Sequence, residues 1–364
     1  MISVNRYLKL YSKKYFLTRI LECSEEELAQ AKGEKGIVCI EDRIPKKGGF
    51  RSIVSVKPGS SLAKLQKKLY KNYLSQIPVS TAAKGFVKGC SYVNFLEEHV
   101  GHSYFLRVDI RDFFDSITKE KLAECLEPFA EKEIADEIME LCTWNGKVPQ
   151  GFSTSPALSN LVFRRIDQRV RKYCRSYHKE MDRRIFYTRY ADDMLFSSAG
   201  TLEFDFCKNK NFKRMIAHIL HQNGFSCNES KTIYAKGEIS LSGYVVSNDV
   251  HLSRQKLCNI NEVIYQFDQR KSYGSISYSL DKATVNIKNI MCNLNKRKMK
   301  KADGTVIQFD SLSDLVYYAA GCRSYLMQIA STEHGDTGYD KQIAKKIRKL
   351  EMILDYLSEE LGEV

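Results

Sequence analysis

Asp192 and Asp193 are adjacent acidic residues between two short β-rich runs, 184–186 and 194–196. The runs predict two strands that face each other across a hairpin turn holding the aspartates. Adjacent like charges repel and a tight turn usually favours Gly or Asn, so the pair is unfavourable unless a cation neutralises it. A solvated surface turn is the alternative reading of the pair alone.

A third carboxylate, Asp109, ends the apolar run 104–108. A central strand there would present Asp109 beside the aspartate turn. Magnesium takes oxygen ligands and is usually held by one or two carboxylates plus substrate phosphates. Two such ions, roughly 3.5–4 Å apart, can activate an attacking oxygen and stabilise a leaving oxygen. The three aspartates have the chemistry to hold two Mg²⁺ ions, with Mn²⁺ as a substitute, but an adjacent pair taken alone is more often a solvated surface turn.

The elements that must position these residues follow from the hydrophobic pattern. Strands and helices mix without regular βαβ alternation up to about residue 253, and the pattern from 254 to 364 is helical throughout. Together these patterns predict an α+β body with a helical appendage. Two further hairpins are expected at Gly48-Gly49 and Asn248-Asp249, the latter between strands 239–246 and 250–252. An extended pattern is expected from 36 to 56. The other expected helices are 1–34, 61–75, 118–126, 131–142, 154–178 and 212–223.

The composition is basic, with a formal charge of +13. Basic runs at 64–71, 164–175, 296–301 and 341–349 predict a surface that follows a polyanion, although solvated basic faces would read the same way. The 11 scattered cysteines form no CxxC pair, so neither a disulfide framework nor a zinc site is expected. No signal peptide or apolar stretch of roughly 18 residues is present, which predicts a soluble, cytoplasmic protein that makes no use of a membrane.

Several ordered segments resemble the motifs of reverse transcriptases, over roughly residues 36–253. Segments 106–117, 149–160 and 187–193 resemble the three central motifs of the family. Before them, 44–53 and 62–66 resemble the fingers hairpin and the helix that follows it. After them, 224–232 resembles the next motif with its lysine, and 241–244 lies where the primer-grip hairpin is expected. The resemblance implies an RNA-directed DNA polymerase with the right-hand polymerase fold.

This fold divides the chain into fingers, a palm with an antiparallel sheet, and an α-helical thumb. We expect the N-terminal helix and fingers at 1–104, the palm at 105–253 and the RNA-binding thumb at 254–364. A fingers-like helical insert is expected at about 118–148 within the palm.

The resemblance also implies catalytic roles. Asp109 and Asp192 would be the principal metal ligands, Asp193 a weaker one, and the backbone carbonyl of Ile110 a further one. Lys231 would neutralise or protonate the departing pyrophosphate, as its charge allows. An ordinary surface lysine is the alternative for Lys231.

A second group of residues is expected to bind the incoming deoxynucleotide. Lys46 or Lys47 and Arg51 would grip the triphosphate, and the guanidinium fork of arginine suits phosphate. Gln150 and Gly151 would line the nucleotide pocket, the glycine because a side chain would crowd the base or sugar.

Phe114 lies five residues after Asp109 and matches the steric-gate position of the family. Its ring would exclude a ribose hydroxyl, and simple core packing beside Phe113 is the alternative.

Within the superfamily, the chain most resembles bacterial retron reverse transcriptases, which belong to the defence-associated enzymes. The stretch 85–91 and the compact basic thumb carry this resemblance, while 94–99 and 241–243 depart from the retron pattern. It implies that the enzyme copies a dedicated structured non-coding RNA into cDNA, primed from an internal 2′-hydroxyl. It also implies a role in anti-phage defence with a separate effector protein.

Alternatives are another defence-associated or group II-like reverse transcriptase and an RNA-dependent RNA polymerase. A non-catalytic RNA-binding scaffold for an effector is the alternative from another class.

Nucleic-acid contacts are expected in two places. The first is the basic run of Lys296, Arg297, Lys298, Lys300 and Lys301, which is expected to be a loop or helix end. The second is the primer-grip segment Leu241, Ser242 and Gly243. Tyr265, Tyr273 and Tyr278 could stack on unpaired bases or pack in the thumb core.

Overall fold

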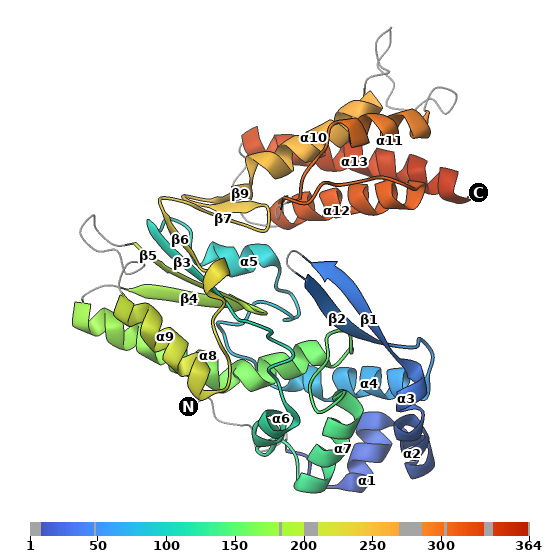
Figure 1. The fold of residues 1–364 in the computed structure, drawn as a ribbon, viewed down its shortest axis with the longest axis vertical. Coiled ribbons are helices and arrows are strands. Elements are labelled where there is room, and N and C mark those ends of the chain that lie inside the picture. The colour runs from blue at the N-terminus through green and yellow to red at the C-terminus, as the bar shows by residue number, and fades with distance from the viewer. Residues whose placement is uncertain are drawn as a thin grey trace. The chain divides into compact units, whose positions relative to one another are not determined.

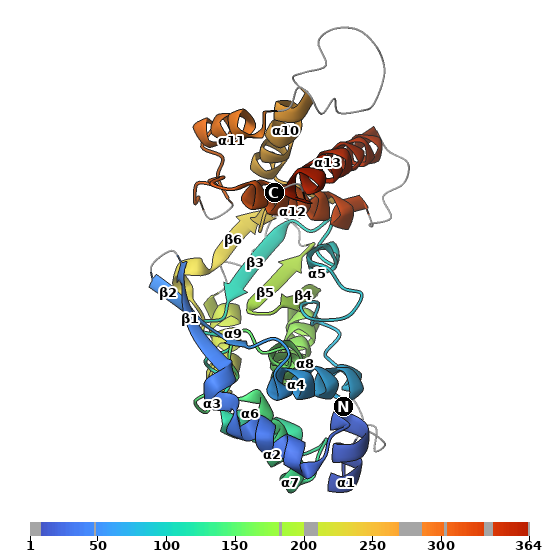
Figure 2. The same ribbon diagram turned by 90° about the vertical axis from the view of Figure 1, so that its right-hand side faces the viewer.

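The computed structural model describes residues 9–46, 49–181, 184–199, 210–268, 286–301, 304–330 and 338–362. The chain forms two compact units (Figures 1 and 2). The first contains Met1–Cys90 and Tyr104–Ala235, and the second contains Ser91–Ser103 and Lys236–Val364.

The first unit is built around a four-stranded sheet in the order β4-β5-β3-β6. Its strands are β4 (Ile185–Tyr190), β5 (Asp193–Ser198), β3 (Tyr104–Asp109) and β6 (Ile233–Lys236). β5 pairs antiparallel with both β4 and β3, which confirms the expected hairpin around the aspartates. Every residue of β5 after Asp193 is buried, because the strand lies inside the sheet.

Helices pack against one another and against this sheet. The two long ones, α8 (Ser155–Met181) and α9 (Lys210–Gln222), lie side by side (Figure 1). The others are α1 (Lys13–Tyr15), α2 (Glu25–Gly33), α3 (Lys35–Val38), α4 (Ser61–Asn72), α6 (Lys119–Leu126) and α7 (Lys132–Cys142), with a π-helix at Phe16–Leu21 and 3-10 turns at Leu74–Gln76 and Glu229–Lys231. One continuous apolar core joins these helices to the sheet.

Local capping explains where several helices begin. The hydroxyl of Ser60 accepts a hydrogen bond from the amide of Ala63 and so starts α4, as expected. Ser24 and Glu27 form a capping box at the start of α2. The expectation of one helical stretch over 1–34 was wrong for the described part, because Glu22 adopts a left-handed conformation and ends the π-helix.

β1 (Cys39–Lys46) and β2 (Gly49–Val56) form a long antiparallel hairpin. The hairpin confirms the expected pattern, but Gly49 pairs with Lys46 as a strand residue instead of forming the tip. The extended run begins later than expected, because 35–38 form the helical turn α3.

In its described residues, the second unit combines a small sheet with four longer helices. The sheet has the order β7-β8-β9, with β7 (Ile239–Leu241), β8 (Tyr244–Val246) and β9 (Val250–Leu252). The helices are α10 (Arg254–Asp268), α11 (Ile287–Lys296), α12 (Leu312–Ala330) and α13 (Gly338–Gly362), and a short helix α5 (Tyr92–Glu97) completes the unit.

Two expectations for this unit were wrong. The predicted strand 239–246 is broken in two, because Ser242 and Gly243 have φ angles of 50° and 89° and form a tight turn. The region after 254 is not helical throughout, since Lys298 has a φ of 48° after α11 and Lys300 forms a β-bridge with Val306. Within the part of the chain that the structure describes, no helix has the length and apolar character needed to cross a bilayer.

Candidate active site

The three predicted aspartates meet at the ends of two neighbouring strands. Asp109 is the last residue of β3 and pairs in register with Asp193, the first residue of β5. Asp192 lies in the turn before β5, and its carbonyl accepts a 3.0 Å hydrogen bond from the amide of Ile110. Asp109 and Ile110 are each only 2% exposed. The structure thus gathers carboxylates that lie more than 80 positions apart in sequence.

A buried network behind the hairpin holds the aspartate turn. Arg189, fully buried on β4, donates from Nη1 to the carbonyl of Ala191 at 3.0 Å. Its Nε and Nη2 bond the two carboxylate oxygens of Asp167 on α8, each at 3.0 Å. Ala191 has a φ of 54°, a left-handed conformation that a non-glycine residue keeps only when its surroundings support it.

The segment before α5 packs directly on this turn. The carbonyl of Gly85 accepts a 2.9 Å hydrogen bond from Nδ2 of Asn160, which is itself bonded to Arg189. A Cβ added at Gly85 would lie 2.6 Å from the backbone nitrogen of Ala191. Glycine is therefore required here by a close backbone approach.

Two cationic side chains lie among the carboxylates. Arg107 bonds Oδ1 of Asp193 through Nε at 2.8 Å and also through Nη2. Its Nη2 lies 3.3 Å from Oδ2 of Asp109, and Nζ of Lys231 lies 3.3 Å from the same oxygen. The predicted lysine therefore reaches the site, with its side chain 56% exposed.

Arg107 was not among the predicted site residues. Side chains alternate between the two faces of a strand, so residues 107 and 109 share a face of β3. Counting back two positions from Asp109 would have identified it as a neighbour of the carboxylates.

Burial makes this a costly place for negative charge. It raises the pKa of Asp193 to about 6, against the opposing pull of Arg107. Burial also raises the pKa of Asp192, and the charge of Asp109 adds to that rise. A bound cation would reverse these effects because it favours the ionised form.

The carboxylates fit a magnesium site that is only partly assembled from protein ligands. Among the described residues, no three His, Cys, Asp or Glu side chains form a ready-made metal cluster. Magnesium needs only one or two carboxylates when substrate phosphates supply other ligands. Asp109 and Asp192 supply that number of carboxylates, although Oδ2 of Asp109 also contacts Arg107 and Lys231 and Asp193 is bonded to Arg107.

The expected steric-gate residue lies in an aromatic group. The ring of Phe114 is partly buried, with its centroid 5.2 Å from Phe113 and 6.2 Å from Phe86. Phe86 in turn lies 6.4 Å from Tyr190, which precedes the aspartate turn. Phe114 thus packs against the core and also lies near Phe86, whose side chain is partly exposed.

The other nucleotide-binding candidates are placed in part. The carbonyl of Gln150 accepts a 2.7 Å hydrogen bond from the amide of Val54 on β2. A Cβ at Gly151 would lie 2.5 Å from the carbonyl oxygen of Val54, so the β1–β2 hairpin by itself leaves no room for a side chain here. Arg51 is exposed on β2. Lys47 lies outside the described residues, and only the backbone of Lys46 is described.

Residues 44–246, more than half of the chain, match the family model described as reverse transcriptase (RNA-dependent DNA polymerase). The chain belongs to this family. The match confirms the predicted right-hand polymerase fold and the predicted RNA-directed DNA polymerase activity.

Curated relatives place the reverse transcriptase near the retron enzymes. It is 27% identical to the retron Ec86 reverse transcriptase of Escherichia coli, over 63% of this chain and 70% of that protein. It is 28% identical to the retron Ec73 enzyme of Escherichia coli, over 66% and 81%. It is 28% identical to the retron Mx65 enzyme of Myxococcus xanthus, over 61% of this chain and about half, 54%, of that protein. The chain is therefore a retron-like reverse transcriptase.

Solved structures with partial likeness include a telomerase and a viral protease-reverse transcriptase. The telomerase of Candida albicans, in complex with a fragment of telomeric RNA, has a TM-score of 0.42 and 12% identity over 88% of this chain and 66% of that chain. A foamy viral protease-reverse transcriptase in complex with double-stranded DNA has a TM-score of 0.36 and 16% identity, over 89% and 46%.

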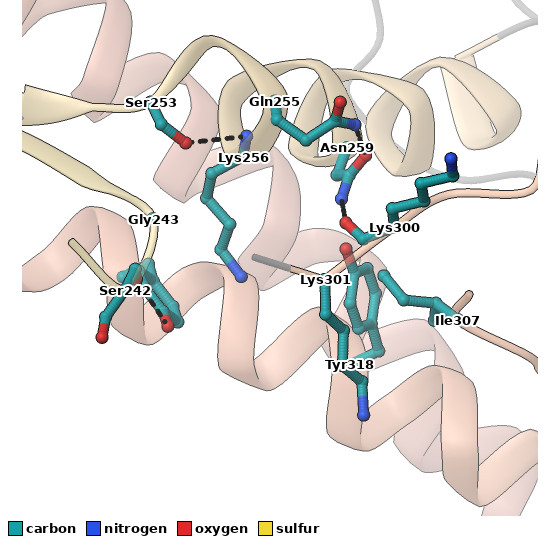
Figure 3. Close-up of a pocket in the computed structure, with 11 residues that line it drawn as sticks. Ser242, Gly243, Ser253, Gln255, Lys256, Asn259, Lys300, Lys301, Ile307 and Tyr318 are labelled. Carbon is teal, nitrogen blue, oxygen red and sulfur yellow. Dashed lines mark hydrogen bonds between the residues drawn. The ribbon is translucent and has the colours of Figure 1, made fainter. Parts of the chain in front are cut away.

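In the second unit of the reverse transcriptase, the two groups of predicted nucleic-acid contacts meet. Ser242 and Gly243 line a pocket of about 370 Å³ together with Lys300 and Lys301 (Figure 3). All five predicted basic residues of 296–301 are exposed, whereas Met299 between them is buried. Leu241 is also buried, so its side chain packs in the core.

Lys256 of the same pocket was missed because it belongs to no basic run. Its Nζ lies 3.7 Å from the centroid of the Tyr325 ring, a cation–π contact, and burial lowers its pKa. Of the tyrosines expected to stack on bases, Tyr265 is 46% exposed on α10. Tyr273 and Tyr278 lie outside the described residues.

Proposed function

We propose that this reverse transcriptase copies a dedicated structured non-coding RNA into cDNA by two-metal-ion nucleotidyl transfer, as part of a bacterial retron anti-phage defence system. In this proposal the fingers are 1–104, the palm is 105–253 and the helical thumb is 254–364. The retron relatives support the choice of template and system. The partners would be the RNA, its cDNA, dNTPs and a separate effector protein in the cytoplasm.

The observation that carries the proposal is the pairing of Asp109 with Asp193, beside Asp192, at the ends of β3 and β5. Asp109 and Asp192, with the carbonyl of Ile110, would hold two Mg²⁺ or Mn²⁺ ions. Such ions activate the attacking hydroxyl and stabilise the leaving oxygen. Asp193 would contribute through its contact with Arg107 and as a weaker ligand.

The chain's own residues would bind and orient the nucleotide. Lys231, whose ammonium lies beside Asp109, would neutralise or protonate the departing pyrophosphate. Lys46 or Lys47 and Arg51 on the fingers hairpin would hold the triphosphate. Gln150 and Gly151, joined to that hairpin through Val54, would line the pocket.

Loss of the carboxylates tests the catalytic proposal. Asp109→Asn and Asp192→Asn should each lower primer extension on an annealed RNA template by roughly 100-fold or more, because a metal ligand contributes several kcal/mol to the transition state. RNA binding should remain. The matched control is Asp136→Asn, which changes an exposed aspartate on α7 and should extend primers normally.

The same assay distinguishes the alternatives. Near-normal extension by the double change at Asp192 and Asp193 would overturn the two-metal reading. A wild-type protein that binds RNA but extends no primer would favour the scaffold function. Sequencing the copurified nucleic acid tests the retron assignment: a branched RNA–DNA hybrid supports it, and unbranched cDNA favours another defence-associated or group II-like enzyme.

A further inference from the structure

The guanidinium of Arg107 lies between the carboxylates of Asp109 and Asp193. Its Nε and Nη2 both bond Oδ1 of Asp193, and Nη2 also lies 3.3 Å from Oδ2 of Asp109. It therefore joins the two aspartates that pair across β3 and β5.

The arginine is held in this position from two sides. Its backbone is fixed within β3, paired with Leu195 of β5. Its Nη1 donates a 3.3 Å hydrogen bond to the carbonyl of Lys231 in the 3-10 turn. The side chain is only 17% exposed, so solvent screens its charge weakly. A fork with several donors can make these contacts at once, which a lysine could not do.

Arg107 and a divalent cation would use some of the same oxygens. Asp109 Oδ2 already faces both Arg107 and Lys231, and Asp193 Oδ1 accepts two bonds from Arg107. A cation that binds the free enzyme must either displace Arg107 and Lys231 from these oxygens or be coordinated by the remaining oxygens of Asp109 and Asp192.

We propose that Arg107 is an internal counter-ion that competes with divalent cations for Asp109 and Asp193. It stabilises the carboxylates in the cation-free enzyme and weakens cation binding until substrate phosphates supply further ligands. Arg107 is thus a positioning residue that couples cation occupancy to nucleotide binding. The inference rests on the proposed two-metal function.

The competing explanation is a purely structural link between β3 and β5. The two explanations differ in how Arg107→Met responds to metal. Loss of a structural link lowers the melting temperature equally with EDTA and with Mn²⁺. Loss of a counter-ion lowers it in EDTA, where three aspartates remain with less compensation, and Mn²⁺ then restores it.

The test is titration of Mn²⁺ into the free enzyme, without nucleic acid or nucleotide, by calorimetry and by melting temperature. Arg107→Met should bind Mn²⁺ roughly tenfold more tightly than the wild type, because a neighbouring charge shifts an ionic equilibrium by about 1–3 log units. Its Mn²⁺-dependent rise in melting temperature should also be larger. Arg107→Lys, which keeps a charge but loses the fork, should fall between the two and serves if the methionine variant does not fold.

Arg111→Met is the matched control. Arg111 is an exposed arginine two residues after Asp109, so its loss removes the same charge nearby while leaving the contacts of Arg107 in place. The Mn²⁺ affinity of Arg111→Met should stay close to that of the wild type. If Arg111→Met gained as much affinity as Arg107→Met, the loss of one positive charge near the site would explain the effect, and the proposal would be overturned. Adding Asp109→Asn and Asp192→Asn to Arg107→Met should abolish the gain, which ties it to this site.

The outcomes separate the inference from the function on which it rests. If the wild type binds Mn²⁺ and Arg107→Met binds it equally or more weakly, the counter-ion proposal is wrong and the two-metal proposal stands. If neither protein binds Mn²⁺ without nucleotide, the counter-ion proposal is wrong, and primer extension by Asp109→Asn and Asp192→Asn decides the two-metal proposal separately.

Discussion

The pKa of Asp193 is raised by burial and lowered by Arg107, and the net effect can be measured. Its carboxylate accepts two hydrogen bonds from Arg107, yet burial dominates and raises its pKa to about 6. The carboxyl of an unfolded chain would titrate near the ordinary value of 3.8. Between these two values, the folded protein holds a proton that the unfolded chain has released.

This difference predicts a pH dependence of stability in EDTA. Because the folded state binds more protons in this window, the free energy of unfolding falls as pH rises from about 4 to about 6. Asp193→Asn should remove up to roughly 3 kcal/mol of that fall. The measurement is the melting temperature of both proteins in EDTA across this range. Parallel curves would show that Asp193 titrates normally in the folded protein.

Phe114 is expected to select deoxynucleotides through the volume of its ring. Phe114→Val should let ribonucleotides enter while largely preserving dNTP use, at a cost in stability of less than about 3 kcal/mol because the ring is only partly buried. The measurement is the ratio of dNTP to NTP incorporation, and unchanged discrimination in a folded variant would make Phe114 a packing residue. Phe113→Leu is the control, since Phe113 is buried beside it and should affect stability alone.

At the scale of elements, the β4–β5 hairpin depends on α8 for the shape of its turn. Asp167 of α8 accepts hydrogen bonds from Tyr187 Oη at 2.7 Å and from Arg189, and both ionic side chains are fully buried. Arg189 in turn donates a hydrogen bond to the carbonyl of Ala191, next to Asp192. The helix thereby fixes the backbone that presents the aspartates.

Removing one partner of this buried pair should be severely destabilising. Asp167→Asn should lower the free energy of unfolding by about 3–5 kcal/mol, because it leaves the charge of Arg189 buried and uncompensated. Denaturant unfolding measures the change. The control is Lys213→Met, which breaks the more exposed pair of Lys213 with Glu229 and should cost less than about 1 kcal/mol. Equal small effects would show that the hairpin does not need α8.

At the scale of the whole molecule, the question is which of the many basic residues contact nucleic acid and which lie on solvated faces. In the second unit, the exposed lysines of 296–301 adjoin the pocket that Ser242 and Gly243 also line. This convergence of two distant segments favours a nucleic-acid contact for that run.

Neutralising Lys298, Lys300 and Lys301 to Gln should weaken RNA binding for all sequences alike. Each lost phosphate contact should flatten the log–log dependence of affinity on salt by roughly 0.7–0.9. Extension of a simple annealed primer at saturating concentration should survive, because none of these residues belongs to the carboxylate site. Binding across a salt series makes the measurement.

A control variant with the same change in net charge separates contact from general attraction. Lys14, Lys132 and Lys210 are exposed lysines of the first unit, and replacing them with Gln alters the total charge equally. The salt dependence should become less steep only in the variant of Lys298, Lys300 and Lys301. The same slope in both variants and the wild type would mean that Lys298, Lys300 and Lys301 do not touch the RNA.

The amino-acid sequence by itself determined the end of the sheet that carries the three aspartates. Apolar runs before Asp109 and on both sides of Asp192 and Asp193 predicted the strands, and the observed register brings Asp109 and Asp193 together. The local pattern failed at Ser242, where a turn breaks an apolar run that reads as one strand. Apolar spacing records which residues are buried but does not show where the backbone reverses.

Only the tertiary structure decided which side chains surround the aspartates. Arg107 meets Asp193 across two strands, and Arg189 meets Asp167 of α8 in the core. These partners are separated by tens of residues, and their contacts depend on strand register and helix packing. Local sequence preferences act over a few residues, so they predicted the elements and the acids they carry but not the ionic contacts that form when those elements pack.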